Sequence, residues 1–175
     1  MKIILLSGGS GKRLWPLSNG TRSKQFIKLL PSPDGSRESM VQRVVRQLKE
    51  CGLDGTITVA TSASQRDVII NQLGDGIPVV TEPERRDTFP AIALACSYLA
   101  YEEQCPAEEI VVVMPCDPYT EQGYFETVRH MADAVGNDAA ELVLMGIRPT
   151  YPSSKYGYVV PSASDKKAMI YKVSR

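Results

Sequence analysis

Glycines and cations are concentrated directly behind the first apolar run of the chain, residues 3–6. The residues of this segment that suit anion binding are Ser7, Gly8, Gly9, Gly11, Lys12 and Arg13. Glycine lets backbone N–H groups approach an anion closely, and the two cations add charge that backbone dipoles alone do not supply. Such a loop behind a strand is typical of a phosphate site. We therefore expect residues 7–18 to wrap a polyphosphate.

Two common glycine motifs do not fit this loop. A Walker loop has a glycine, four residues, and then Gly-Lys followed by Ser or Thr, whereas Leu6 and Arg13 occupy the first and last of these positions. The dinucleotide fingerprint fits Gly9 and Gly11 but has Leu14 at its third glycine. The loop therefore belongs to neither class.

Three more charged residues are candidates for the same pocket. Lys24 and Lys28 flank a short apolar segment, and a loop lysine taken alone is more often solvated. Asp117 follows the apolar run 109–114, and open α/β sheets bind ligands at the carboxyl ends of their strands. Asp117 could equally cap the next helix. The phosphate loop adds weight to a magnesium role, because Mg²⁺ prefers carboxylate oxygen and commonly bridges substrate phosphates.

A charged loop and an aromatic loop follow later in the chain. Residues 82–90 contain five charged side chains and two prolines, and loops of this kind carry function more often than packing. Asp87 or Thr88 can also cap the following helix, with Pro90 in its first turn. In the second loop, residues 148–158, tyrosines beside a glycine suit a sugar, and a packed tyrosine is an equally good explanation.

Strand and helix alternate throughout the predicted structure. We expect helices at 39–51 (ending at Gly52), from a Ser62 cap to Gly74, at 91–100 and at 121–136, and strands at 3–6, 56–60, 77–81, 109–114 and 142–147, with a hairpin of 158–160 and 168–173. The helix at 91–100 is apolar nearly all round, which predicts a central position against the sheet, and strand 109–114 is typical of an inner parallel strand. The predicted architecture is a three-layer αβα sandwich with a mostly parallel mixed sheet.

Composition narrows the class of protein. The 175 residues match the size of one domain, and 20 basic against 20 acidic residues do not favour a nucleic-acid partner. Neither a secretory signal nor a membrane span is apparent, so we expect a cytoplasmic protein with no membrane partner. The four cysteines have no metal-ligand spacing and are predicted to be free thiols. The single histidine, His130, is expected on a surface helix, so the chemistry must run without a histidine base.

Four blocks in order, residues 8–18, 24–26, 82–92 and 146–158, resemble the sugar-1-phosphate nucleotidyltransferases, and within them the guanylyltransferase branch that acts on mannose 1-phosphate. The resemblance implies a Rossmann-like nucleotide-diphospho-sugar transferase fold. It also implies transfer from GTP to mannose 1-phosphate, giving GDP-mannose and pyrophosphate. A phosphate nucleophile is already ionised at neutral pH, which fits the lack of a histidine base.

The resemblance also implies a role for each site residue. Arg13 neutralises the leaving pyrophosphate, Lys24 stabilises the reacting phosphates, and Asp117 binds Mg²⁺. The residues implied to bind the nucleotide are Ser7, Gly8, Gly9, Gly11 and Lys12, with Glu82, Thr88 and Pro90 beside the guanine. Gly157 and Tyr158 would lie beside the mannose. Charge stabilisation is then the main catalytic device.

The chain departs from the family pattern at several positions. Cys116 and Pro118 replace Ser and His, Asp87 and Phe89 replace Asn and Ala, and Lys155 replaces Gly. We expect residues 1–175 to form one catalytic domain that stops before the family's later sugar contacts and second metal-binding aspartate. Two alternatives remain open: a module that binds GTP or GDP-mannose without turnover, and a transferase for another sugar 1-phosphate. The expected partners are GTP and a sugar 1-phosphate, with a homodimer as one candidate assembly.

Overall fold

The computed structural model describes residues 1–8, 16–18, 23–53, 57–154, 156–162 and 170–174. Gly9, Gly11, Lys12 and Arg13 lie outside the described residues, so their roles stay predictions. The chain forms two compact units, residues 1–143 and 144–175, and each is described by itself. The single domain expected from the sequence also stays a prediction.

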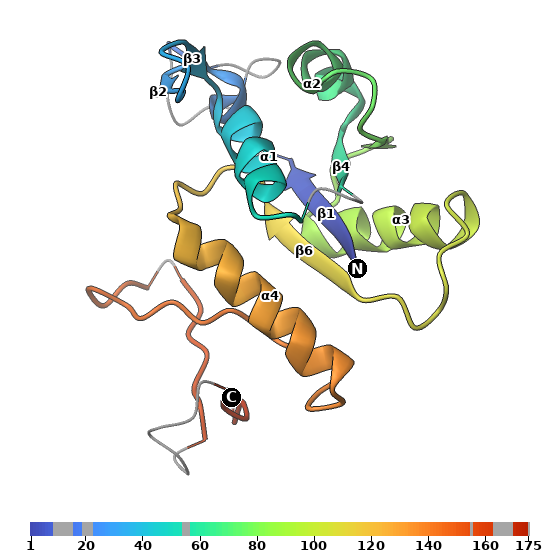
Figure 1. Cartoon of the computed structure of the whole chain (residues 1–175), viewed down its shortest axis with the longest axis vertical. Helices are drawn as coiled ribbons and strands as arrows, with labels where there is room; N and C mark the ends of the chain where they lie inside the picture. Colours follow the sequence, from blue (N-terminus) through green and yellow to red (C-terminus); the bar gives the residue numbers. More distant parts are fainter. Residues whose placement is uncertain (9–15, 19–22, 54–56, 155, 163–169, 175) are drawn as a thin grey trace. The chain divides into compact units, whose positions relative to one another are not determined.

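A parallel sheet of four strands forms the centre of the first unit (Figure 1). Its strands are β1 (Lys2–Ser7), β4 (Ile57–Ser62), β5 (Val79–Glu82) and β6 (Val111–Pro115), in the order β5-β4-β1-β6. Leu5 of β1 lies opposite Val59 on one side and Met114 on the other. The strands β2 (Leu30–Pro31) and β3 (Arg37–Glu38) form a separate antiparallel pair. The predicted α/β class is confirmed.

Helix α1 (Met40–Glu50) begins and ends as the sequence predicts. Ser39 and Gln42 form a reciprocal capping box, which satisfies two backbone N–H groups at the helix start. At the other end Gly52 has φ +67°, a conformation that glycine adopts at no steric cost. Both helix boundaries therefore follow from local chemistry.

Ser62 does not cap helix α2 (Arg66–Leu73), so that prediction is wrong. Ser62 is the last residue of β4, and a 3-10 turn, η3 (Ala63–Gln65), separates it from the helix. Its hydroxyl bonds that of Ser64 at 3.1 Å and makes no capping bond. The predicted stop at Gly74 is confirmed, with φ +84°.

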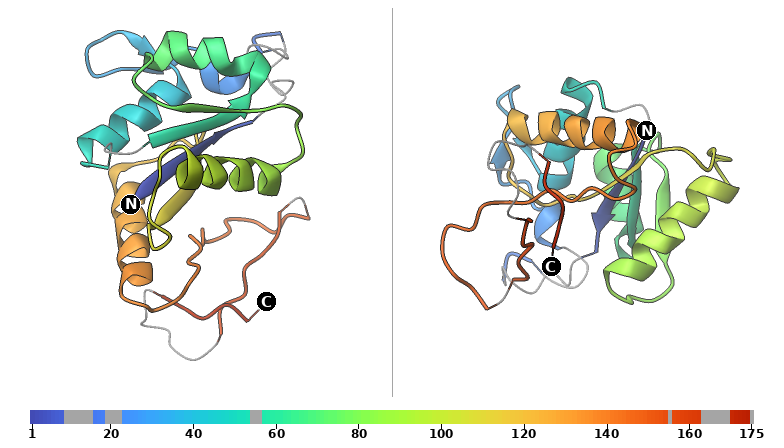
Figure 2. Two further views of the ribbon diagram at one scale, coloured as in Figure 1. Left: turned by 90° about the vertical axis from the view of Figure 1, so that its right-hand side faces the viewer. Right: turned by 90° about the horizontal axis from the view of Figure 1, so that it is seen from below.

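Helices pack on both faces of the sheet, which gives three layers within the first unit (Figure 2). Side chains of a strand alternate between faces, so Ile3 and Leu5 join one core while Ile4 joins the other. The first core includes buried residues of α1, α2 and α4 (Gln122–Gly136). The second core is smaller and is built on α3 (Thr88–Tyr101).

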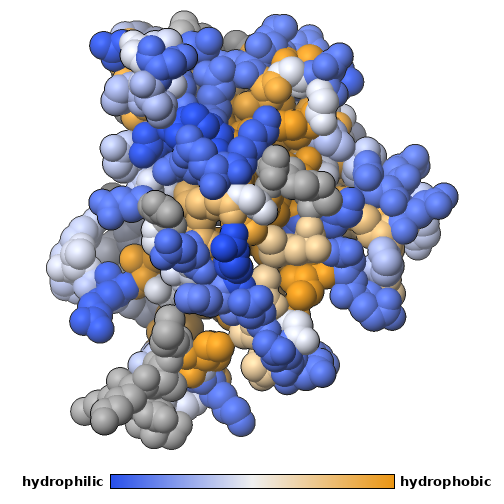
Figure 3. Space-filling view, viewed as in Figure 1, coloured by the Kyte–Doolittle hydropathy of each residue, from blue (hydrophilic) through white to orange (hydrophobic). Residues whose placement is uncertain are grey.

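Helix α3 is not buried all round, contrary to the prediction from its composition. It buries a single stripe, Ala91, Ala95 and Leu99, against the sheet, while Phe89 and Tyr101 are 79% and 81% exposed. Apolar composition shows which faces of a helix can be buried, but a packing partner is needed on each face. On the face drawn in Figure 3, apolar surface likewise lies between hydrophilic residues.

Strand β6 is the end strand of the described sheet, not an inner one, with Val111 and Val113 partly exposed. The predicted strand at 142–147 is also wrong, because those residues form no strand in the structure described. Strand propensity depends on a hydrogen-bonding neighbour, and Leu142 and Ile147 are left exposed without one. The two wrong predictions, an inner position for β6 and a strand at 142–147, have the same cause: the described residues place no further strand beside either segment.

The second unit has little regular structure among its described residues. An antiparallel bridge joins Pro161 to Val173, and Ser162 N donates to Lys172 O at 2.7 Å. This is one isolated bridge where the sequence predicts a hairpin, and residues 163–169 of that hairpin lie outside the description. Across both units, the described helices include none that is long and apolar enough to cross a membrane.

Candidate active site

A cavity of about 710 Å³ opens at the carboxyl ends of the parallel strands. Ligands bind at this edge in open α/β sheets because the loops that follow the strands meet there. The residues that line it are Leu6, Gly8, Lys24, Gln25, Ala60, Glu82, Arg85, Asp87, Thr88, Ala91, Pro115, Cys116 and Asp117. Two cations and three carboxylates therefore face one space.

Lys24 and Asp117 form an ion pair in this cavity. Lys24 Nζ lies 2.5 Å from Asp117 Oδ2, and both side chains are about one-third exposed (33% and 34%). Lys24 begins the 3-10 turn η2 (Lys24–Phe26). Two glutamine side chains hold the ends of that turn: Gln65 Nε2 donates to Ser23 Oγ at 2.6 Å, and Gln72 Nε2 donates to Phe26 O at 2.9 Å.

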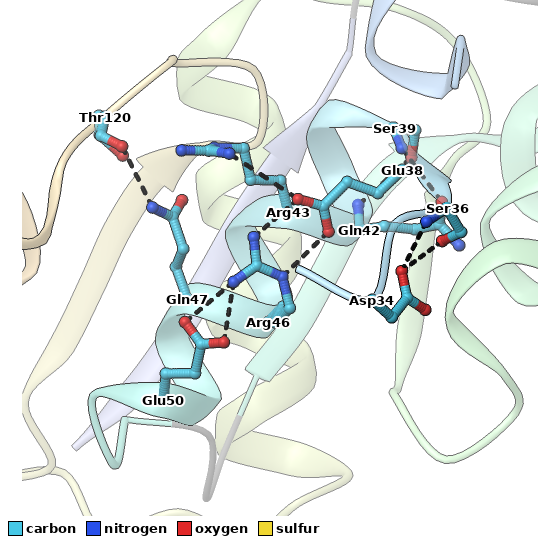
Figure 4. A network of polar contacts seen from close by, with 10 residues as sticks. All are labelled: Asp34, Ser36, Glu38, Ser39, Gln42, Arg43, Arg46, Gln47, Glu50 and Thr120. Carbon is cyan, nitrogen blue, oxygen red and sulfur yellow. Dashed lines mark hydrogen bonds and ion pairs between the residues drawn. The ribbon is translucent and has the colours of Figure 1, made fainter. Parts of the chain in front are cut away.

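The segment after Asp117 is attached to α1. The Arg43 guanidinium lies 4.5 Å from the ring centroid of Tyr119, a cation–π contact. Gln47 Nε2 donates to Thr120 O at 3.1 Å (Figure 4). These contacts hold Tyr119 and Thr120 against α1, two and three residues after Asp117.

Glu38 organises the arginines of this helix (Figure 4). Its buried carboxylate accepts two hydrogen bonds from Arg46, at 2.7 and 3.0 Å, and lies 3.8 Å from Arg43 Nη1. Arg46 also donates to Glu50 at 2.8 Å. The hydrogen bonds to Glu38 raise the pKa of Arg46, so the guanidinium stays charged. The Glu38 network thus fixes the face of α1 that contacts the Asp117 segment.

Glu82 supplies a buried carboxylate at the opposite side of the sheet order, at the end of β5. It is 8% exposed, and no hydrogen bond or ion pair to it is found within the described parts of the chain. Its Oε2 atom lies 4.0 Å from the point that a Gly8 Cβ would occupy. Because the side chain lines the cavity, its carboxylate can accept hydrogen bonds from a ligand that brings N–H groups.

Asp87 is the N-cap of α3 and has a strained backbone. Its side chain accepts a hydrogen bond from Thr88 N at 2.9 Å, which confirms one of the two predicted caps. Its φ and ψ are 70° and −166°, a region in which residues other than glycine are rare. Strain at a cavity wall is typical of functional sites, and the sequence offers no signal for it.

Cys116 is a buried thiol next to Asp117. Burial raises the pKa of Cys116 to about 12, so the thiol stays protonated at neutral pH. A protonated, inaccessible thiol is neither a nucleophile nor a metal ligand. All four cysteines are free thiols, as predicted.

Comparisons with known proteins place this arrangement in a family. The model of the family described as "Nucleotidyl transferase" matches residues 2–173. The chain belongs to the nucleotidyl transferase family. Two curated relatives called mannose-1-phosphate guanylyltransferase are 31% identical: one from Sinorhizobium fredii, with 90% of this chain and 31% of the relative covered, and one from Escherichia coli, with 98% and 36% covered.

A solved structure agrees with this nucleotidyl transferase assignment. A Thermus thermophilus protein, described as a mannose-1-phosphate geranyltransferase, has a TM-score of 0.73 and 29% identity, covering 94% of this chain and 46% of that one. The fold of the chain is therefore that of its family. The chain spans about a third of the length of the two curated relatives.

Five of the predicted site residues of this nucleotidyl transferase line the cavity: Gly8, Lys24, Glu82, Thr88 and Asp117. The prediction that Asp117 caps the next helix is wrong, because α4 begins at Gln122 with Glu121 as its N-cap. The roles of these five cavity-lining residues in binding and catalysis stay predictions.

Other predicted residues of the nucleotidyl transferase lie elsewhere. Ser7 is buried at the end of β1, and Pro90 is exposed in the first turn of α3; neither is among the lining residues. Gly157 and Tyr158 belong to the second unit, where the Tyr158 hydroxyl accepts from Ser153 N at 2.7 Å and donates to Ser153 O at 3.1 Å. These two hydrogen bonds join the ends of the segment 153–158 within the second unit. His130 is exposed on α4, as predicted.

Sequence reasoning missed Arg85 and Gln25, which also line the cavity of this nucleotidyl transferase. Arg85 stands in the charged segment 82–90, so its charge was visible, but the sequence does not show which of two adjacent arginines faces the cavity. Gln25 is buried in η2 and had no signal beyond its place beside Lys24.

Proposed function

We propose that this chain carries the nucleotide site of an enzyme that transfers a guanylyl group from GTP to mannose 1-phosphate, yielding GDP-mannose and pyrophosphate. The observation that carries the proposal is the Lys24–Asp117 pair in the same cavity as the buried carboxylate of Glu82. The names of the two curated relatives support the choice of substrates.

In this reaction an oxygen of the sugar phosphate attacks the α-phosphorus of GTP, the bond between the α-phosphorus and the bridging oxygen breaks, and pyrophosphate leaves with that electron pair. The attacking oxygen is already ionised, so the step needs no general base. Lys24 would stabilise the charge that develops on the phosphates, with Lys12 and Arg13 as further cations of the preceding loop. Gly8 would let the backbone approach the nucleotide closely.

Magnesium fits the donor set of this cavity. Asp117 is a partly exposed carboxylate on the cavity wall, and Mg²⁺ is commonly held by one or two carboxylates together with substrate phosphates. The described residues contain no group of three acidic, histidine or cysteine side chains that could hold a metal alone. We therefore assign Asp117 as a magnesium ligand that acts together with the bound phosphates. The metal would supply charge neutralisation on those phosphates.

A second candidate is a module that binds GTP or GDP-mannose without turnover. Like the first candidate, it would use the cavity that contains Lys24, Glu82 and Asp117. The candidates differ in a single measurement, because both require nucleotide binding but only the first releases pyrophosphate.

Pyrophosphate release from GTP and mannose 1-phosphate with Mg²⁺ tests the proposal, together with calorimetric binding of GTP. We expect binding and release. Asp117→Ala should abolish release and weaken GTP binding in the presence of Mg²⁺, whereas the matched surface variant Asp133→Ala on α4 should retain both. Binding without release would support the second candidate. A folded chain that binds no GTP would overturn both. Glucose 1-phosphate in place of mannose 1-phosphate tests the choice of sugar.

A further inference from the structure

Two adjacent arginines of the segment after β5 have different surroundings. Arg86 Nη2 lies 2.8 Å from Glu84 Oε2, both side chains are 70% exposed, and Arg86 does not line the cavity. Arg85 does line it, and its Nη2 donates to Ser62 Oγ at 3.4 Å. No carboxylate pairs with Arg85 in the portion of the chain that is described. The cavity therefore receives a guanidinium that no carboxylate of the described residues holds in an ion pair.

Most of the donors of Arg85 remain available to a ligand. A guanidinium has five N–H donors in a fixed fork, and the bond to Ser62 uses one of them near the upper limit of hydrogen-bond length. Such a fork matches two neighbouring acceptors on a planar group.

Glu82 restricts what this part of the cavity can hold. It lies three residues before Arg85 in the chain, lines the same cavity and is 8% exposed. A phosphate placed here would be repelled by the carboxylate. A neutral, planar group with donors for Glu82 and acceptors for Arg85 would satisfy both side chains.

Guanine has this combination of groups. Its N1–H and N2–H₂ are adjacent donors, and its O6 and N7 are adjacent acceptors that arginine binds in a bidentate manner. Adenine presents N7 beside the N6–H₂ donor, so it offers arginine one acceptor in place of two. The chemistry on both sides therefore favours guanine.

The family resemblance already implies that Glu82 lies beside the guanine. We infer in addition that Arg85 is a specificity-determining residue that donates to O6 and N7 of the base. This inference rests on the proposed GTP site and names the residue that selects its base. Arg86, held by Glu84, has no part in it.

Calorimetric titration with GTP, 7-deaza-GTP and ATP tests the inference on the wild-type chain, Arg85→Ala and the matched control Arg86→Ala. In 7-deaza-GTP a carbon replaces N7, so one acceptor is lost while the phosphates are unchanged. For the wild type we expect GTP to bind about tenfold more tightly than 7-deaza-GTP or ATP, within the range of a bidentate arginine–guanine contact. Arg85→Ala should remove most of this preference, and Arg86→Ala should keep it.

Each other outcome identifies a different failure. Equal loss of GTP and ATP affinity in Arg85→Ala would show a phosphate contact and overturn the inference, as would a wild type without base preference or an Arg85→Ala variant that keeps it. A wild type that binds no nucleotide would overturn the proposed function itself.

Discussion

Lys24 Nζ and Asp117 Oδ2 lie 2.5 Å apart, although the two residues belong to segments far apart in the chain. Lys24 begins the turn η2, and Asp117 follows β6. The pair joins these two segments at the edge of the sheet where the cavity opens. It thus brings the cation that we propose to bind phosphate next to the carboxylate that we propose to bind magnesium.

The Lys24–Asp117 pair is expected to matter for ligand binding more than for folding. Both side chains are about one-third exposed, and such pairs contribute about 0.2–1 kcal/mol to stability. Lys24→Met and Asp117→Asn should therefore shift urea unfolding by less than about 1 kcal/mol. Lys24→Met should weaken GTP binding with or without Mg²⁺, whereas Asp117→Asn should weaken it only with Mg²⁺. A Mg²⁺-independent effect of Asp117→Asn would contradict the assigned role.

Replacement of Glu38 is expected to lower the free energy of unfolding by about 2 kcal/mol, since hydrogen bonds to charged groups contribute about 1.5–3 kcal/mol. The buried carboxylate accepts two bonds from Arg46, and Glu38→Ala leaves that guanidinium with one exposed partner, Glu50. Urea unfolding measures the loss. Glu50→Ala, which removes the exposed partner, serves as control and should cost a few tenths of a kcal/mol. Equal losses would show that burial of Glu38 has no effect.

Substitutions at Asp87 separate the capping bond from the backbone strain. Asp87→Ala loses the bond to Thr88 N and keeps the strained φ of 70°, so we expect it to be destabilised by about 1 kcal/mol or more. Asp87→Gly loses the same bond but relieves the strain, and it should be more stable than the alanine variant by about 1–2 kcal/mol. Thermal and urea unfolding measure both. An alanine variant as stable as the glycine variant would show that this backbone is not strained in solution.

Cys116 is expected to be unreactive in the folded protein. A variant with serine at the other three cysteines, Cys51, Cys96 and Cys105, leaves Cys116 as the only thiol, which we expect to react with Ellman's reagent at about pH 8 only after unfolding. Rapid reaction of the native variant would show that the thiol is accessible.

The same thiol predicts a loss of stability at alkaline pH. Its pKa is raised from an ordinary value of 9.0 to about 12 in the folded state by burial, so the unfolded chain loses the proton first. The contribution of the buried thiol to the stability of the folded state is fully present below about pH 9 and is lost as the pH rises toward about 12. The free energy of unfolding, measured with urea across this pH range, should fall less steeply for Cys116→Ser than for the wild type.

The sequence by itself determined the elements whose signals are local. The helix at 39–51 and the Gly52 and Gly74 stops depend on neighbouring residues and backbone groups, and each is found in the structure. Strand β1 was also predictable, because a continuous apolar run marks a buried strand of a parallel sheet. The apolar run of β6 likewise located Asp117 behind a strand, although β6 is an end strand. These features place the site at the carboxyl edge of the sheet.

Only the tertiary structure decided which predicted residues meet and which faces are buried. Local sequence does not show that Lys24 reaches Asp117, that Arg85 and not Arg86 faces the cavity, or that Asp87 is strained, because each depends on segments distant in the chain or on the loop's path. The exposed sides of α3 and β6 have the same origin. Apolar composition makes burial favourable, but a surface is buried only where another part of the fold packs against it.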